Sequence, residues 1–284
     1  MLPALLFAGL ILGLIVIWSV GGILIAPANH PIGNPPADLP VQNVEFSSAS
    51  GATIHGWLAT PTNTPVKGVI VLMHGIHATR VSMTARAEFL YRAGYTVLWF
   101  DFQGHGESIG KFITAGYLES RDATAAVNYV QAHFPGQKIG VIGVSMGGAA
   151  ALEAKPPLPV DAMVIESCYP TIYQAIDNRI VVRLGPLGHL CTPLVTWQFK
   201  PRLGIGSDDL CPIKDAAHLT VPKFFISGDV DVNTPATEAK ALFEAASEPK
   251  QFWIIEKAGH QDMHAFARAE YESRILAFFT LHLK

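Results

Sequence analysis

The pentapeptide Gly143-Val144-Ser145-Met146-Gly147 constrains the chain more than any other stretch. An apolar run, residues 138–142, precedes it, and a segment of small residues, 148–152, follows. This order predicts a strand, a sharp turn and a helix, with Ser145 at the apex of the turn. Glycines two before and two after the serine remove side chains that would collide where strand and helix cross closely. Ser145 is therefore a candidate nucleophile presented at the start of a helix.

Short apolar segments alternate with helical patterns on both sides of this turn. Such alternation predicts an α/β fold, with a mostly parallel sheet covered by helices on both faces. Two alternating runs, 41–46 and 53–58, predict a β-hairpin that completes an eight-stranded mixed sheet. The predicted parallel strands are 69–73, 96–100, 139–142, 162–165, 224–227 and 252–255, and the predicted helices are 83–92, 117–133, 146–154, 237–246 and 264–282.

The chain begins with a segment, Leu2 to Ala26, that contains no charged residue. Its length predicts a single-pass transmembrane anchor over residues 1–26, which would locate the protein at a membrane. A cleaved signal peptide, favoured by the small residues around Ala26, and a buried core helix are the alternatives. No Lys or Arg precedes the segment, so its orientation is not predicted. Residues 27–40 contain five prolines and predict a linker without helix or strand, followed by one domain over 41–284.

The interval between the fourth and fifth parallel strands breaks the alternation. A structureless loop of this length is improbable in a folded domain, so residues 167–220 are predicted to form a cap of short helices over the carboxyl ends of the strands. Its larger apolar residues either line an acyl pocket or, the reading we favour, only pack the cap onto the body. These residues are Tyr169, Tyr173, Leu184, Leu187, Trp197 and Phe199.

Composition excludes several classes of protein. The formal net charge is −3 and the basic residues are scattered, which argues against a nucleic-acid partner. The three cysteines, Cys168, Cys191 and Cys211, lack metal-ligand spacing, and reduced thiols are favoured over one disulfide. His264 lies four residues after His260, but without an H-E-x-x-H pattern this spacing is weak evidence for a metal.

Reactive side chains follow the predicted strands at their carboxyl ends, where sites form in open α/β sheets. Ser145 follows one strand, Asp229 and Asp231 follow another, and His260 follows the last. A serine hydroxyl needs a base to remove its proton, and a histidine can perform this near neutral pH. A carboxylate would orient the imidazole and stabilise its charged form. On position alone, both aspartates compete for that role.

These motifs, in the order serine, aspartate, histidine, resemble those of the α/β-hydrolase superfamily from about residue 41 to the C-terminus. Within it, the chain is most similar to the Bem46-like, serine aminopeptidase S33-type hydrolases. The matching segments are Leu72-Met73-His74-Gly75, the loop 101–108, the Ser145 turn, Asp231 with Pro235, and Gly259-His260. Gln103 departs from the pattern, because the family commonly has arginine there.

The resemblance implies a catalytic triad of Ser145, Asp231 and His260, since the family spacing selects Asp231 over Asp229. Two backbone N–H groups would bind the developing oxyanion, each contributing on the order of 3–4 kcal/mol. The expected donors are Met146 and Ile76, with His77 as a neighbour, and His74 is expected to hold the shape of its loop. No cofactor is implied.

The function expected from these residues is hydrolysis of a carboxylic ester or thioester through an acyl-serine intermediate. The substrate would be a small ester or acyl compound of moderate acyl length. A serine aminopeptidase or amidase is the alternative enzyme. A catalytically silent, membrane-anchored interaction module is the alternative of a different class. Tyr117, Glu119 and Asp122 are expected to form the exposed start of a helix.

Overall fold

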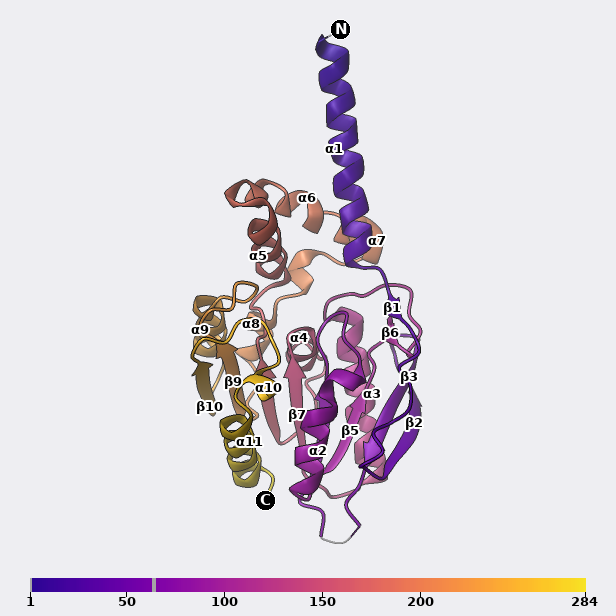
Figure 1. Cartoon of the computed structure of the whole chain (residues 1–284), viewed down its shortest axis with the longest axis vertical. Coiled ribbons are helices and arrows are strands. Elements are labelled where there is room, and N and C mark those ends of the chain that lie inside the picture. The colour runs from indigo at the N-terminus through magenta and orange to yellow at the C-terminus, as the bar shows by residue number, and fades with distance from the viewer. Residues whose placement is uncertain (1, 63–64) are drawn as a thin grey trace.

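The computed structural model describes residues 2–62 and 65–284, and its centre is a single eight-stranded sheet (Figure 1). The strand order is β10-β9-β8-β7-β4-β5-β3-β2, parallel throughout except that β3 is antiparallel to both β2 and β5. The predicted mixed sheet with a hairpin at one edge is confirmed. The bounds are β2 Val41–Ser47, β3 Thr53–Ala59, β4 Val69–Met73, β5 Thr96–Phe100, β7 Ile139–Val144, β8 Ala162–Glu166, β9 Lys223–Gly228 and β10 Lys250–Ile255.

Helices cover both faces of the sheet. Helices α2 (Thr84–Arg92) and α11 (Arg268–His282) pack on one face, and α3 (Tyr117–His133), α4 (Met146–Leu152) and α9 (Ala236–Ala245) pack on the other. The two apolar layers bury every side chain of the central strand β4, which explains its uninterrupted apolar sequence. A short 3-10 helix, η1 (Arg80–Met83), leads into α2.

The last predicted helix, 264–282, is two helices. The short α10 (Met263–Phe266) begins at Asp262, whose carboxylate accepts hydrogen bonds from the N–H groups of His264 and Ala265. Ala267, at φ −123° and ψ 41°, leaves the helical conformation before α11 begins. The apolar pattern runs through this break, so the sequence did not reveal it.

The interval after β8 consists of short helices above the carboxyl ends of the strands (Figure 1). Among its residues, Cys168, Cys191 and Cys211 are free cysteines, as expected. The helices are α5 (Ile172–Leu184), η2 (Pro186–Leu190), α6 (Thr192–Thr196), α7 (Phe199–Leu203), η3 (Ser207–Asp209) and α8 (Pro212–Ala216).

The N-terminal segment forms helix α1 (Leu2–Leu24), which projects beyond the cap at the end of the molecule opposite the C-terminus (Figure 1). Within the described parts of the chain, no helix has the length and apolar content needed to span a membrane. The predicted transmembrane anchor and membrane attachment therefore gain no support, and Met1 lies outside the described residues. The base of α1 rests on the cap, where the Arg202 guanidinium lies 3.9 Å from the ring centroid of Trp18.

The predicted linker is also held to the body. Residues Ala28–Asn29 form β1, which pairs in parallel with β6 (His105–Gly106). The amide of Asn29 donates to the carbonyls of Gly106 and Ser108, at 3.1 and 2.9 Å. The prediction of a linker without strand is wrong here, because two residues are too few to leave a periodic pattern in a proline-rich sequence.

The first turns of α3 are buried, not exposed as the sequence suggested. Glu119 accepts hydrogen bonds from Thr114 and Gln103, at 2.6 and 2.7 Å from its two oxygens. Asp122 accepts from the hydroxyl of Ser48 (2.6 Å) and from the N–H of Gln103 (2.9 Å). Both carboxylates are fully buried. Gln103, where the family commonly has arginine, thus joins the 101–108 loop to α3.

Burial raises the pKa of Asp122 from its ordinary value to about 7, since its hydrogen-bond donors only partly replace water. The folded protein thus binds a proton that the unfolded chain has released above about pH 4. The free energy of unfolding should therefore fall as pH rises from about 4 to about 7, by up to ~1.4 kcal/mol per pH unit from this group.

Urea denaturation at pH 5 and pH 7.5 tests this assignment. Asp122→Asn should show a smaller loss of stability between these pH values than the parent protein. Asp208→Asn, at an exposed position, should keep the parent slope. Equal slopes for Asp122→Asn and the parent would contradict a raised pKa at Asp122.

Candidate active site

Ser145 occupies the strained turn that the sequence predicts. Its backbone is at φ 51° and ψ −112°, between the end of β7 and the start of α4. A Cβ atom at Gly147 would lie 2.3 Å from the carbonyl oxygen of Met73, and one at Gly143 would lie 2.6 Å from the carbonyl oxygen of Gly147. Both glycines are therefore required by close backbone approaches, and the turn holds the serine at the carboxyl edge of the sheet.

His260 and Asp231 come from the loops that follow β10 and β9. Nδ1 of His260 lies 2.8 Å from Oδ2 of Asp231. The other carboxylate oxygen accepts the N–H groups of Asn233 and Thr234, both at 2.8 Å, which fixes the buried carboxylate. Asp229 is exposed, and the recorded carboxylate contact of the imidazole is with Asp231. The geometry thus selects Asp231 as the partner of His260, leaving Nε2 of the ring to face a substrate.

Ser145 and His260 line the same cavity. The hydroxyl of Ser145 is buried and has no hydrogen-bond partner among the described residues. The structure therefore brings the aspartate and histidine into contact but records no bond between histidine and serine. Hydrogen bonds between nucleophile and base often shorten only when substrate is bound.

Two backbone N–H groups near Ser145 remain available as donors. For the described residues, no hydrogen bond is recorded from the amide of Met146 or from that of Ile76. The neighbouring amide of His77 instead donates to Nε2 of His105 at 3.1 Å. The amide of Ile76 is thus available where that of His77 is not, and both Ile76 and Met146 line the cavity at Ser145.

His74 holds the shape of this loop. Its Nδ1 donates to the carbonyl of Gly75 (2.7 Å) and its Nε2 accepts the N–H of Phe102 (3.1 Å). Burial, with a smaller contribution from His105, lowers the pKa of His74 to about 3. The ring stays neutral near pH 7, so it can join the two loops without a buried charge.

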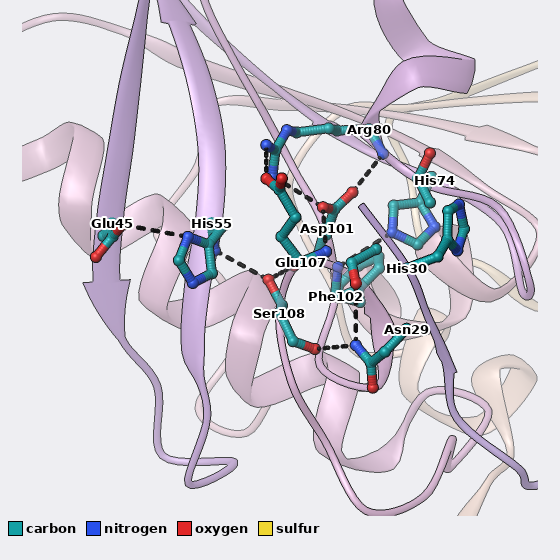
Figure 2. A network of polar contacts seen from close by, with 12 residues as sticks. Asn29, His30, Glu45, His55, His74, Arg80, Asp101, Phe102, Glu107 and Ser108 are labelled. Atoms are coloured by element: carbon teal, nitrogen blue, oxygen red, sulfur yellow. Dashed lines mark hydrogen bonds and ion pairs between the residues drawn. The ribbon is translucent and has the colours of Figure 1, made fainter. Parts of the chain in front are cut away.

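Polar contacts tie the loop after β5, residues 101–108, to the segments around it (Figure 2). The buried carboxylate of Asp101 accepts the backbone N–H of Arg80 (2.7 Å) and its guanidinium (2.8 Å), and Arg80 also pairs with Glu107. The hydroxyl of Ser108 donates to the carbonyl of Asp101 at 2.7 Å and accepts the N–H of His55 at 2.9 Å. These contacts hold η1 and the hairpin, and they explain why the loop carries so many polar residues.

A second buried network joins the loops of Ser145 and His260. The N–H of Ser145 donates to the carbonyl of Glu166 at 2.7 Å, and the Glu166 carboxylate binds Arg86 at 2.7 and 3.2 Å. Arg86 also pairs with Asp262, two residues after His260, at 2.8 Å. Tyr271 donates its hydroxyl to Glu166. Sequence reasoning missed this network, because its members are far apart in the chain and follow no local spacing.

An apolar cavity of about 70 Å³ has Ser145 at its wall. Tyr169 and Phe199 line it, as one reading of the cap proposed. The other four aromatic and aliphatic candidates of the cap are at least 40% exposed and do not line it. Leu24, the last residue of α1, and Ile25 after it complete the wall. Sequence reasoning missed them because the segment looked like a separate anchor.

His264 has a structural partner. Its Nε2 lies 2.9 Å from Glu272, and its ring stacks on Phe89 with centroids 5.1 Å apart. Among the described residues, no group of three or more His, Cys, Asp or Glu side chains is arranged to hold a metal ion. His264 therefore packs between α2 and α11, and this packing accounts for a histidine four residues after His260.

Comparison with known proteins agrees with this geometry. The family model described as "Serine aminopeptidase, S33" matches residues 64–168, which include β4, the 101–108 loop and the Ser145 turn. Over the matched segment the chain is similar to this family, and it shares the fold of a solved α/β hydrolase, GrgF of Penicillium. An uncharacterised protein of Mycobacterium tuberculosis is 27% identical over 250 residues, covering 87% of this chain and 82% of the relative. Human monoglyceride lipase is 31% identical over 131 residues, 45% of this chain and 41% of the lipase.

The fold is also that of a solved esterase. The Pyrococcus furiosus esterase Pf2001 superposes with a TM-score of 0.76 at 22% identity, covering 92% of this chain and 99% of the esterase. At this identity the likeness concerns the fold. It extends over the sheet and most of the rest of the chain.

The contrast between the two aspartates gives a direct prediction. Asp231→Asn should lower kcat by about 10⁴-fold on any substrate that the protein turns over, because the imidazole loses its orienting carboxylate. Asp229→Asn changes an exposed side chain and leaves the contact between His260 and Asp231 in place, so it should leave kcat within about twofold. Steady-state kinetics measures both. A larger loss in Asp229→Asn than in Asp231→Asn would show that the wrong carboxylate is assigned.

Proposed function

We propose that this protein is a serine hydrolase that cleaves a carboxylic ester or thioester through an acyl-serine intermediate. The observation that carries the proposal is the apolar cavity with Ser145 in its wall. Apart from Arg179, the described side chains that line it carry no charge. Such a cavity suits a hydrocarbon chain, whose burial contributes about 0.8 kcal/mol per CH₂ group.

The proposed reaction uses the described residues in sequence. His260 takes the proton of the Ser145 hydroxyl as the oxygen attacks the acyl carbonyl, and Asp231 stabilises the imidazolium. The N–H groups of Ile76 and Met146 bind the oxyanion of the tetrahedral intermediate. As the bond to the leaving group breaks, His260 returns the proton to that group. Water, deprotonated by the same imidazole, then releases the acid and restores Ser145.

An aminopeptidase or amidase is the second enzyme candidate, favoured by the description of the matching family model. Recognition of a free amino terminus calls for a carboxylate near the scissile bond. Among the described residues lining the two cavities at Ser145, the only acidic side chain is Asp262, and it pairs with Arg86. The charge of the site therefore favours the ester. A catalytically silent module is the third reading, which the strained serine turn disfavours.

A substrate panel tests the proposal. We expect hydrolysis of p-nitrophenyl esters with a maximum at moderate acyl length, hydrolysis of an acyl thioester, and slower turnover of an amino-acid amide. Ile25→Trp puts a larger side chain into the lining of the apolar cavity, so it should lower kcat/KM for the octanoyl ester at least about tenfold relative to the acetyl ester. Spectrophotometric rates across the panel give both comparisons.

Leu187→Trp is the control, because Leu187 is 75% exposed in the same cap. It should leave the chain-length profile of the parent unchanged. Turnover of the amide alone, or no turnover of any panel member by the folded protein, would contradict the proposed function. An unchanged profile in Ile25→Trp would remove the apolar cavity from the acyl site.

A further inference from the structure

A second cavity opens on the other side of Ser145 and has a different character. Its wall includes His260, Asn233 and Gln261, together with three arginines, Arg86, Arg179 and Arg183. Ester cleavage needs room for two groups, the acyl chain and the leaving group. With the acyl chain in the apolar cavity, the leaving group would lie in this polar one, beside the histidine that protonates it.

Arg179 lines both cavities, as do Ile76 and Ser145. Helix α5 presents Ile172, Ala175 and Ile176 to the apolar cavity, and Arg179 continues the same helical face. Its Nη1 donates to the carbonyl of Ala175 at 2.7 Å. The guanidinium thus stands where the apolar face ends and the polar cavity begins, with Arg183 one turn further along the helix.

The charge of Arg179 is not compensated by a contact. Among the described residues, no carboxylate lies within 4.0 Å of its guanidinium. The nearby Asp231 is bound to His260, and Glu238 is held by the Asn178 amide at 3.0 Å. Arg80 and Arg86, the other arginines that are largely buried, each bind two carboxylates.

An unpaired, half-buried guanidinium is costly unless an anion reaches it. Burial lowers the pKa of Arg179, although an arginine keeps its charge under all ordinary conditions. The donors not used by Ala175 form a planar fork, the geometry that carboxylate and phosphate groups fit. Arg183 adds a second positive charge at the outer side of the same cavity.

We propose that the natural substrate carries a negative charge on its leaving group, and that Arg179 binds this charge. The leaving group is an alcohol or thiol bearing a carboxylate or a phosphate. This inference rests on the proposed ester or thioester hydrolysis and deepens it. Arg179 is thereby a specificity-determining residue, whereas the bond cleaved and the roles of Ser145 and His260 stay the same.

Matched esters test the proposal. Octanoyl esters of 4-hydroxybenzoate, of its neutral methyl ester and of 4-hydroxyphenyl phosphate share one acyl chain and differ in leaving-group charge. Arg179→Gln should lower kcat/KM for the two anionic esters by about 10- to 100-fold relative to the neutral one. For each ester, kcat/KM of the variant is divided by kcat/KM of the parent, so the intrinsic reactivity of the ester cancels. The carboxylate and phosphate arms show which anion is preferred.

Two variants distinguish direct binding of the anion by Arg179 from long-range attraction by the positive charge of the cap. Lys200→Gln removes an exposed cap charge that lines neither cavity, so it should not change the ratio of anionic to neutral rates. Arg179→Lys keeps the charge without the planar fork and should fall between the parent and Arg179→Gln. An equal loss in Lys200→Gln would indicate long-range attraction and overturn the assignment to Arg179.

The remaining outcomes are also decisive. If Arg179→Gln hydrolyses all three esters with the parent's ratios, the inference is wrong while the proposed function stands. If the folded parent hydrolyses none of the esters in this set or in the panel, the proposed function itself fails. Should Arg179→Gln not fold, inhibition of the parent decides: phenyl phosphate should compete with the neutral ester more strongly than phenol. Equal inhibition by the two overturns the inference.

Discussion

The backbone turn at Ser145 is the constraint on which the rest of the site depends. A non-glycine residue held at positive φ stores strain, which persists only where the surroundings impose it. Here Gly147 lies directly against the end of β4, so the helix that follows cannot shift without losing that contact. The position of the hydroxyl is therefore determined by sheet and helix packing before any polar contact is made. Loops from four strand ends then arrange their groups around it.

Buried polar groups fix those loops relative to one another. The Arg86–Glu166 pair lies between the amide of Ser145 and the loop of His260, and it is fully enclosed. Breaking such a pair leaves an uncompensated charge, which costs about 3–5 kcal/mol, so the arrangement resists local rearrangement. His74 performs a similar role as a neutral ring. The buried guanidinium groups of Arg80 and Arg86 are thus paired with carboxylates. Arg179 differs, because its guanidinium lines the cavity instead.

Local patterns in the sequence predicted the sheet and the main helices, because strand and helix periods and glycine positions are short-range signals. They also pointed to Ser145, directly after β7, and to His260, in the loop after β10. Arg86 and Arg179 were not found, since their partners and cavities depend on which distant segments meet. The buried position of Asp122 was missed because its burial depends on the 101–108 loop folding over α3. Ile25 was assigned to a separate segment, although it completes the apolar cavity.

The central claim is that Ser145 is the nucleophile. Reaction of the purified protein with a fluorophosphonate, followed by mass spectrometry of its peptides, tests it most directly. The account predicts a single stoichiometric adduct on the peptide containing Ser145, with labelling lost in Ser145→Ala and strongly slowed in a His260→Ala variant. An adduct on another residue, or no adduct on the folded protein, would contradict the account.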